Sequence, residues 1–336
     1  MSLLIHKPGL LTTVQDLGRY GFQKYGVTVG GAMDAFALRI ANLLVGNEEG
    51  EAGLEITMMG PEIVFEQTAL ISICGGDLSP KLNGVSLPGW RTILAPKGST
   101  LNFGPMKQGC RAYLAVSGGV DVPVQMNSRS TYLRAGIGGY HGRALAKGDR
   151  LPVGSMSLQS LHMLGLLARE AENNLGAVSR WAVSADLIPP YEPNPVIRVI
   201  AGEQYDLFRE ESKALFISEP FEVLPQSDRM GYRLNGPELK LMKTVEMISS
   251  AVTMGTVQVP PDGNPIVLMA DRQTTGGYPM IAQMASMDLP LLAQVNLGGK
   301  VRFQLISLRE AQRQLIEREQ AILALRQGLG HLQQRK

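Results

Sequence analysis

Short apolar runs separated by turn residues dominate the pattern of this chain. The runs are bounded by Gly, Pro, Asp and Asn, which is typical of strands joined by tight turns. Four of them cover Leu70–Cys74, Ala112–Ser117, Pro265–Ala270 and Val301–Ile306. Their density favours barrels or sandwiches over alternating strand–helix units, so the pattern predicts a mainly β fold.

Apolar residues recur at helical spacing in three segments. The carboxylate of Asp34 can cap the first helix, and Gly46 ends it. The second helix is expected from about Ser157 to Asn174. The third is C-terminal and begins at a capping box, in which the Ser307 hydroxyl and the Glu310 carboxylate each accept a free backbone N–H. Its apolar stripe comprises Leu308, Ala311, Leu315, Ile322, Leu325, Leu329 and Leu332.

The stripe of the C-terminal helix has to be covered by something. Arg318 interrupts its near-heptad spacing, so a sustained coiled coil is not expected. Packing along the chain's own barrel and docking against a partner chain or symmetry mate both remain open. Gly328 and Gly330 weaken the last turns by roughly 1 kcal/mol each, so residues 327–336 are expected to be dispensable for folding.

The proline-rich stretch 189–195 divides the chain into two halves. Proline lacks the N–H donor and fixes φ, so this stretch is unsuited to a helix or a central strand. We expect domains at 1–188, with a helical insertion near 157–175, at 189–308, and a C-terminal helix at 309–336. Similar runs recur in the same order in both halves, which favours a diverged duplication. The paired runs are 16–21 with 228–232, 54–56 with 246–248, 117–120 with 275–278, and 147–151 with 299–303.

Composition narrows the functional class. Apolar residues make up 44% of the 336 residues and charged residues 18%, which is a globular profile. The net charge is +2 with no basic tract, so nucleic acid is not an expected partner. The N-terminus is not an expected signal peptide, and no apolar run is long enough for a membrane span. Cys74 and Cys110 are expected to be buried free thiols of a cytoplasmic protein, and the four histidines have no metal-ligand spacing, so no metal site is predicted.

The richest polar cluster follows the predicted strand that ends near Ala270. Asp271, Arg272 and Gln273 together supply an acceptor, a fork of donors and an amide, which suits a planar N–H/C=O group. These three residues and Asp228 are the candidate catalytic residues. A purely local turn, with Asp and Thr bonding the backbone, is the alternative. The candidate substrate-binding residues are Arg229, Gln258, Thr274, Thr275, Gly276, Gly277 and Tyr278.

Two weaker signals lie elsewhere. The adjacent Asp228 and Arg229 are expected to face a cleft between the halves, although such a pair is often only surface charge. In the first half, Arg19 and the Gly30–Gly31 turn form a candidate anion-binding loop before the first helix. No dinucleotide fingerprint or phosphate-loop motif is present, so any ATP chemistry is expected to be shared with other chains. Neither Lys107 nor Lys243 has the sequence setting of a biotinylated lysine, so no covalent biotin is expected.

Several long runs resemble the biotin-dependent carboxyltransferase, or allophanate hydrolase subunit 2, family. The runs that carry the resemblance are 8–21, 30–34, 37–42, 228–234, 257–260 and 273–279, and they extend over nearly the whole chain. The resemblance implies two tandem cyclophilin-like β-barrel domains. The length, the 30–34 run and the C-terminal helix are similar to a branch of stand-alone members that serve as the C subunit of bacterial ATP-dependent 5-oxoprolinase.

That branch implies an ATP-dependent lactam hydrolase active only with partner subunits. The implied reaction converts 5-oxo-L-proline, ATP and water into L-glutamate, ADP and phosphate. The implied partners are a KipI-like B subunit and an A subunit, and the implied cofactor is ATP shared with them, with Mg as a candidate metal. Two alternatives stay open: a regulatory protein that sequesters the histidine-kinase inhibitor KipI, and a carboxyltransferase that acts on a urea-like substrate.

Overall fold

The computed structural model describes residues 2–170, 176–243 and 245–332. The chain divides into two compact units. Unit 1 comprises residues 1–18, 34–189 and 320–336, and unit 2 comprises residues 19–33 and 190–319. Residues 19–33, which were expected in the N-terminal half, therefore group with the C-terminal segment, and the last helix is shared between the units. Within the described residues, no helix is both long and apolar enough to cross a membrane.

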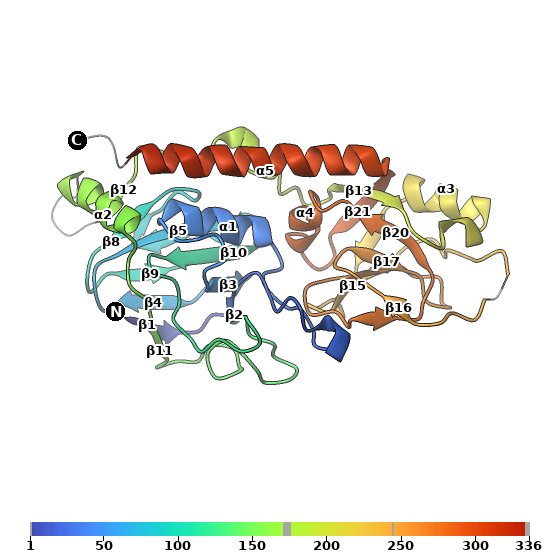
Figure 1. Cartoon of the computed structure of the whole chain (residues 1–336), viewed down its shortest axis with the longest axis horizontal. Coiled ribbons are helices and arrows are strands. Elements are labelled where there is room, and N and C mark those ends of the chain that lie inside the picture. Colours follow the sequence, from blue (N-terminus) through green and yellow to red (C-terminus); the bar gives the residue numbers. More distant parts are fainter. Residues whose placement is uncertain (1, 171–175, 244, 333–336) are drawn as a thin grey trace. The chain divides into compact units, whose positions relative to one another are not determined.

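Unit 1 contains two six-stranded sheets with the core between them (Figure 1). The first has the order β11-β1-β4-β9-β6-β7, formed by Arg150–Pro152, Ser2–Lys7, Glu62–Phe65, Thr100–Asn102, Lys81–Leu82 and Val85–Ser86. The second has the order β12-β8-β5-β10-β3-β2, formed by Ala177–Val178, Ile93–Ala95, Ala69–Asp77, Gln108–Val116, Gly53–Thr57 and Leu11–Gln15. Residues such as Leu3, Phe65, Ile71 and Leu114 alternate inward and are fully buried, which makes this core the main stabilising feature of the unit.

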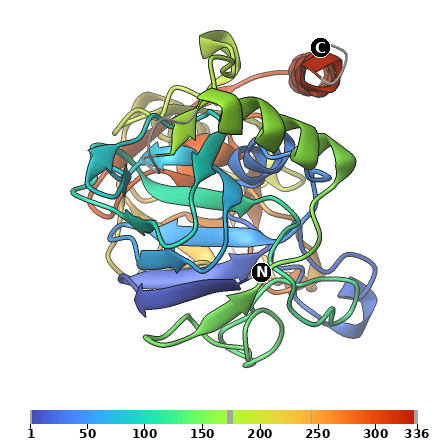
Figure 2. The same cartoon turned by 90° about the vertical axis from the view of Figure 1, so that its left-hand side faces the viewer.

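Two helices cover the second sheet of unit 1 (Figure 2). α1 (Ala35–Leu44) packs on β5 and β10, and α2 (Leu158–Glu170) packs on β8, β5 and β12. The Asp34 side chain accepts a hydrogen bond from the backbone N–H of Ala37, which confirms the predicted cap. The predicted second helix is confirmed as far as Glu170, and the next five residues lie outside the described part of the chain.

Unit 2 is built on a closed barrel of seven strands (Figure 1). Its order is β13-β20-β17-β18-β15-β14-β21, formed by Val196–Ala201, Met280–Met284, Thr256–Gln258, Ile266–Leu268, Gly231–Asn235, Phe221–Val223 and Lys300–Leu305. Closure leaves no free edge in this sheet. A separate ladder pairs β16 (Ser250–Ala251) with β19 (Thr275–Gly276). The rings of Phe216 and Phe303 stack at a centroid distance of 4.5 Å, which fastens helix α3 (Glu210–Ser218) to the barrel.

The remaining helices are three 3-10 turns, the short helix α4 and the long C-terminal helix α5. Three 3-10 turns cover Gln23–Tyr25, Ala185–Leu187 and Tyr205–Leu207, and α4 covers Leu289–Ala293. α5 covers Leu308–His331, and the Ser307 hydroxyl accepts the backbone N–H of Glu310 at 3.1 Å, which confirms the predicted start of this helix. Among the described residues of α5, only Ile322 and Leu329 are buried.

The mainly β fold class is confirmed, and all four strands singled out in the sequence are present. The proposed internal repeat is reproduced only in places. Asp16 and Asp228 each accept the backbone N–H two residues further on, at 2.8 Å in both cases. The paired runs 54–56 and 246–248 do not correspond, because the first lies in β3 and the second lies outside every strand.

Candidate functional site

The candidate site in unit 2 lies in the residues that directly follow β18. The backbone N–H of Asp271 donates to the carbonyl of Arg229 at 2.8 Å, and the backbone N–H of Met269 donates to the carbonyl of Met230 at 3.0 Å. These bonds extend the β15–β18 pairing beyond the strands themselves. As a result, two residues 42 positions apart in the sequence face each other at fixed distance.

Arg229 and Asp271 form a bidentate ion pair. The Nε and Nη2 atoms of Arg229 donate to Oδ2 and Oδ1 of Asp271 at 2.9 and 3.0 Å. Arg229 is 8% exposed and Asp271 is 5% exposed, so the pair is shielded from water. Parallel N–H···O bonds between a planar guanidinium and a carboxylate fix both groups in orientation as well as in charge. Two predicted site residues, one candidate catalytic and one candidate binding residue, therefore act as one rigid unit.

The predicted glycine turn closes over this ion pair. Nη2 of Arg229 donates to the carbonyl of Gly31 at 2.6 Å, and the N–H of Gly30 donates to the carbonyl of Ala270 at 3.2 Å. Both glycines have positive φ, 66° and 87°. A Cβ on Gly30 would lie 3.2 Å from Nη1 of Arg19 and 3.5 Å from Oδ1 of Asp271, so a side chain there would press on both.

Arg19 brings a second buried guanidinium to the same place. Its side chain is fully buried, and its backbone N–H donates to the carbonyl of Val29 at 2.7 Å, which ties together the segment before the glycine turn. The candidate anion-binding residues Arg19, Gly30 and Gly31 thus gather around Asp271. Sequence reasoning grouped Arg19 with the glycine turn, but it gave no reason to place that loop beside Asp271.

Arg272 adds a third guanidinium with unused bonding capacity. Burial lowers the pKa of its side chain, while the nearby Tyr20 works in the opposite direction. Nη1 of Arg272 donates to the carbonyl of Met269 at 3.4 Å. Its Nε is buried and has no hydrogen-bond partner in the described part of the chain. A buried donor without an acceptor is costly, and an incoming carboxylate or carbonyl oxygen would satisfy it.

The remaining residues of the predicted cluster lie in different settings. Gln273 and Thr275 are exposed, and Thr274 is half-buried, with its carbonyl accepting the backbone N–H of Val252 at 3.1 Å. The side chain of Asp228 is exposed and bonds the backbone N–H groups of its own turn. For Asp228 the local turn interpretation therefore describes the observed contacts, and of this adjacent pair Arg229 is the residue that reaches into the site.

Gln258 supports the glycine run rather than pointing to solvent. It is 2% exposed, and its Nε2 donates to the carbonyl of Tyr278 at 3.3 Å. A Cβ on Gly276 would lie 2.4 Å from that Nε2 atom, so a side chain at this position would displace the Gln258 amide. Gly277 and the half-exposed Tyr278 follow in the same turn.

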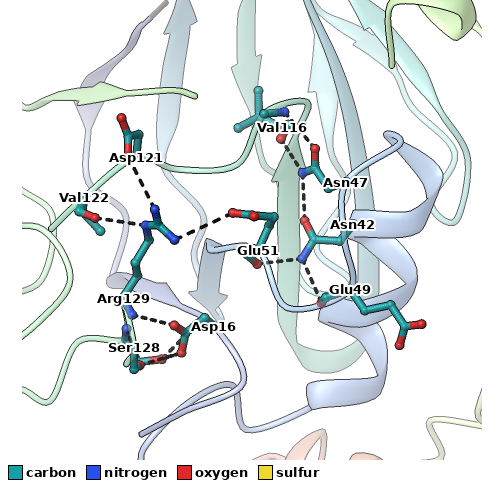
Figure 3. Close-up of polar contacts among 12 residues, drawn as sticks. Asp16, Asn42, Asn47, Glu49, Glu51, Val116, Asp121, Val122, Ser128 and Arg129 are labelled. Atoms are coloured by element: carbon teal, nitrogen blue, oxygen red, sulfur yellow. Dashed lines mark hydrogen bonds and ion pairs between the residues drawn. The ribbon is translucent and has the colours of Figure 1, made fainter. Parts of the chain in front are cut away.

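Asp16, the first-half counterpart of Asp228, anchors a loop of unit 1 (Figure 3). Its carboxylate accepts hydrogen bonds from the hydroxyls of Ser128 and Ser130 and from the backbone N–H of Arg129. The Arg129 side chain then lies 3.7 Å from Asp121 and donates to the carbonyl of Val122 at 3.1 Å. These contacts of the Asp16 carboxylate fix backbone and hydroxyl groups, so its role is to order the 121–130 segment.

A buried polar cluster of unit 1 was missed by sequence reasoning. The Tyr113 hydroxyl donates to Oε2 of Glu55 at 2.9 Å and accepts the backbone N–H of Asp34 at 2.8 Å. Burial, and then the neighbouring Glu55, raise the pKa of Tyr113 well above its ordinary value. The signal was present in the alternation along β3 and β10, because both residues lie between core positions and so face the opposite side of the sheet.

Cofactor-binding features are few in the described residues. Among them, no three His, Cys, Asp or Glu side chains are grouped so that they could hold a metal ion. Cys74 and Cys110 are free and buried, which confirms their predicted state, and burial raises the pKa of both thiols. The chemistry available where Arg19, Arg229, Asp271 and Arg272 gather is that of guanidinium groups and one carboxylate, a set suited to binding an anion or a polar planar group.

Comparison with known proteins identifies relatives over almost the full length. The chain is 40% identical over 310 residues to the C subunit of 5-oxoprolinase from Escherichia coli, which covers 92% of this chain and 93% of the relative. It is 38% identical to the corresponding 5-oxoprolinase chain of Haemophilus influenzae, with 89% of each chain covered. The crystal structure of K. lactis urea amidolyase superposes with a TM-score of 0.86 at 29% identity, over 96% of this chain but only 20% of the amidolyase.

The family relationship follows from the extent of these matches. The family described as carboxyltransferase domain, subdomain A and B, matches residues 25–305, a range that spans both compact units. The full-length relatives and the amidolyase structure agree with that match. The chain belongs to the carboxyltransferase domain, subdomain A and B, family.

Proposed function

We propose that this chain is the C subunit of an ATP-dependent 5-oxoprolinase. One observation carries the proposal: 40% identity to the C subunit of the E. coli 5-oxoprolinase over nearly the whole length of both chains. A match of that extent includes the segments that build the Asp271–Arg229 site, rather than a shared barrel alone. The reaction would cleave 5-oxo-L-proline to L-glutamate, with ATP and water converted into ADP and phosphate.

The site of unit 2 suits the substrate of this reaction. 5-Oxo-L-proline carries a carboxylate and a lactam, whose carbonyl oxygen accepts and whose N–H donates hydrogen bonds. The buried Nε of Arg272 is a donor without an acceptor, and the fixed carboxylate of Asp271 has its orientation set by Arg229. We assign the substrate carboxylate or the lactam oxygen as the acceptor for Arg272. The Arg229–Asp271 ion pair would hold the neighbouring backbone in a fixed position.

The chemical difficulty of the reaction explains why more groups are needed. A lactam is a poor electrophile, and phosphorylation of its oxygen by ATP would activate the ring carbonyl carbon. One water would then add to that carbon, and the C–N bond would break with the nitrogen protonated to become the amine of glutamate. A second water would hydrolyse the resulting acyl phosphate to the carboxylate and phosphate. Donors aimed at the developing charge would assist this step. The proposal therefore includes ATP, with Mg as its counter-ion, shared with a KipI-like B subunit, and an A subunit that completes hydrolysis. No covalent biotin is part of it.

Reconstitution tests the proposal. The chain is mixed with B and A subunits, and phosphate release is measured with and without 5-oxo-L-proline. Arg272→Gln should lower turnover at least about tenfold, the typical cost of losing one positioned donor. Arg233→Gln, which removes an exposed guanidinium from β15 of the same barrel, is the matched control and should leave turnover unchanged. Full activity in a folded Arg272→Gln complex would refute the site, and no 5-oxoproline-dependent turnover would refute the function.

Gln273→Ala separates the two parts of the predicted cluster. If Gln273 is a catalytic residue, as the sequence suggested, this substitution should lower turnover about tenfold. Gln273 is exposed in this chain, so it would contact the substrate only if a partner chain covers it. Equal activity of Gln273→Ala and the wild-type complex would restrict the site to Asp271, Arg272 and Arg229.

A carboxyltransferase acting on a urea-like substrate is the second candidate. The observation that favours it is the superposition with K. lactis urea amidolyase over 96% of this chain. Urea shares a planar C=O and N–H groups with the lactam, so the same guanidinium and carboxylate set would suit both. Carboxyl transfer from carboxybiotin to urea, measured alongside lactam cleavage, distinguishes them. Tight binding of the B subunit without turnover of either substrate would favour the regulatory role.

A further inference from the structure

A pocket of about 460 Å³ opens on unit 2 beside the glycine turn that carries Tyr278, and none of its lining residues is part of the Arg229–Asp271 ion pair. Three segments build it: residues 238–241 with 243, 245 and 247, the turn at 259–263, and the turn at 277–279. The volume lies within the range of small-molecule sites, about 300–1,000 Å³. A molecule the size of 5-oxo-L-proline would leave most of this space empty, so a larger ligand fits it better.

The shape of the pocket is fixed by backbone hydrogen bonds. Leu239 N–H donates to the carbonyl of Gly263 at 2.9 Å, and Gly263 N–H donates to that of Pro260 at 2.9 Å. Gly263 has a φ of 81°, and a Cβ there would lie 3.0 Å from Cβ of Glu238. Val259 N–H donates to the carbonyl of Pro279 at 3.0 Å, which joins the two turns. The pocket is therefore preformed, which lowers the ordering cost of binding.

Flat apolar surfaces line most of the pocket. Leu239 and Val259 are almost fully buried beneath it, and Pro260 and Pro279 add rigid rings. The Tyr278 side chain is 46% exposed, so an aromatic face is available in the pocket wall. An exposed tyrosine beside proline rings is a surface on which a planar heterocycle can stack.

Four charged residues line the pocket: Glu238, Lys240, Lys243 and Asp262. Lys240 lies 3.1 Å from Glu238, and that pair is largely exposed. The carboxylate of Asp262 accepts the backbone N–H of Asn264 at 3.0 Å, within its own turn. Among the residues that the structure describes, Lys243 forms no ion pair. An ammonium at the rim of an apolar pocket suits a ligand that ends in a phosphate.

We propose that this pocket binds a purine nucleotide, with the base against Tyr278 and the phosphates toward Lys243. Pocket volume, a planar apolar wall and an uncommitted ammonium at the rim point together to a ring joined to a polyanion. The choice of a nucleotide among such ligands rests on the proposed function, because that reaction consumes ATP. The pocket makes Tyr278 and Lys243 nucleotide-binding residues rather than lactam-binding ones.

Titration of the full chain with ATP, ADP and AMP, without partner subunits, tests the proposal. Tyr278→Ala should weaken ATP binding at least about fivefold, which is the lower limit for losing one base-stacking aromatic ring. Lys243→Ala should weaken ATP roughly tenfold and AMP less, because fewer phosphates reach the ammonium. Tyr25→Ala and Lys300→Ala, which remove an exposed tyrosine and an exposed lysine of the same unit outside the pocket, should not change binding.

Three results would overturn the nucleotide pocket: no ATP binding at millimolar concentration, ATP affinity unchanged in both pocket variants, or tripolyphosphate binding as tightly as ATP. The proposed function is tested separately, by measuring turnover in the reconstituted complex. If 5-oxoproline-dependent turnover persists with an unchanged KM for ATP in Tyr278→Ala and Lys243→Ala, the pocket fails and the function stands. If ATP binds the pocket but no lactam supports turnover, the function fails and the pocket stands.

Discussion

Removing one partner of the buried Arg229–Asp271 pair should be strongly destabilising. Asp271→Leu takes the carboxylate away from the Arg229 guanidinium, which is 8% exposed and also donates to the neutral Gly31 carbonyl. Breaking a buried ion pair from one side costs about 3–5 kcal/mol, because an uncompensated charge stays in a low-dielectric site. For a domain of this size each kcal/mol lowers Tm by about 2–4 °C, so the unit 2 transition should shift by roughly 6–20 °C.

Replacing both partners should recover much of that loss. In Arg229→Met/Asp271→Leu neither charge of the pair is left buried, and the Gly31 carbonyl loses this donor, at a cost of about 1–3 kcal/mol. The double variant should therefore be more stable than Asp271→Leu alone. Differential scanning calorimetry of the wild type, Arg229→Met, Asp271→Leu and the double variant gives the coupling free energy between the two positions. The measurement requires that the transitions of the two units are resolved.

An exposed pair in the same unit provides the control. Glu238 and Lys240 lie 3.1 Å apart with about 60% of each side chain exposed, and Glu238→Gln should change stability by at most about 1 kcal/mol. Additive effects of Arg229→Met and Asp271→Leu would refute the reasoning. So would a loss in Asp271→Leu as small as that in Glu238→Gln, because the pair would then not be shielded from water.

Two further predictions concern titratable groups of unit 1. The pKa values of Cys74 and Cys110 are raised by burial, so neither thiol should react with a disulfide reagent in the native protein. In denaturant, two thiols per chain should react. Labelling of either cysteine in the native protein would refute their burial. Hydrogen bonds from Arg143 hold the pKa of Asp149 below its ordinary value, so the carboxylate stabilises the fold above its unfolded pKa of about 3.9 and loses this effect as the pH falls through the lower folded value. The stability difference between wild type and Arg143→Gln, measured by urea titration, should shrink from pH 7 to pH 3; a difference that stays constant would exclude the ion pair as its cause.

Helices α1, α2 and α5 were predictable from sequence because their signals are local, whereas α3 and α4 were not predicted. The cap at Asp34 and the first half of the capping box at Ser307 lie within three residues of the N–H groups that they bind. A side chain that close in sequence is held near its partner by the chain itself, whatever the tertiary fold does. Two strands of the barrel, β18 and β21, were equally visible because each is a short apolar run that follows a turn containing glycine.

The arrangement of the site was not predictable, because it depends on pairings between distant segments. Asp271 and Arg229 were both named, but their ion pair follows from the register of β15 on β18. The grouping of residues 19–33 with unit 2 has no signature in the sequence. Gln273 was placed beside Asp271 in the hypothesis, yet Gln273 is exposed and Asp271 is buried, because both follow the end of β18 and no longer keep the alternation of a strand.

Burial of charged residues was the weakest point of the sequence interpretation. Nothing in the sequence indicates that Arg19 and Glu55 are buried, since charged side chains are rarely buried without partners. Both are almost fully buried. For Glu55 the partner is Tyr113 on the neighbouring part of the sheet, a residue that composition alone classifies with the apolar core. Only the pairing of β3 with β10 shows that the two face each other.

α5 gives a matched pair of leucines with opposite burial. Leu329, a member of the predicted stripe, is 4% exposed, whereas Leu323, which follows Ile322 and lies outside the stripe, is 53% exposed. The sequence argument expected residues 327–336 to be dispensable because Gly328 and Gly330 weaken the helix. The burial of Leu329, and the hydrogen bond between Nε2 of His162 and the carbonyl of Leu332 at 3.0 Å, indicate that this end of the helix is anchored on unit 1.

The two leucines therefore separate packing from helix propensity. Leu→Ala keeps the helix propensity nearly constant, so the difference between Leu329→Ala and Leu323→Ala reports burial. Leu329→Ala should cost about 2–5 kcal/mol, and Leu323→Ala should stay within about 0.5 kcal/mol of the wild type, measured by urea unfolding of unit 1. Equal and small effects would mean that the end of α5 is not held in place and that residues 327–336 are dispensable after all. A larger effect at Leu323 would instead reveal that its exposed side is covered in solution by a second chain.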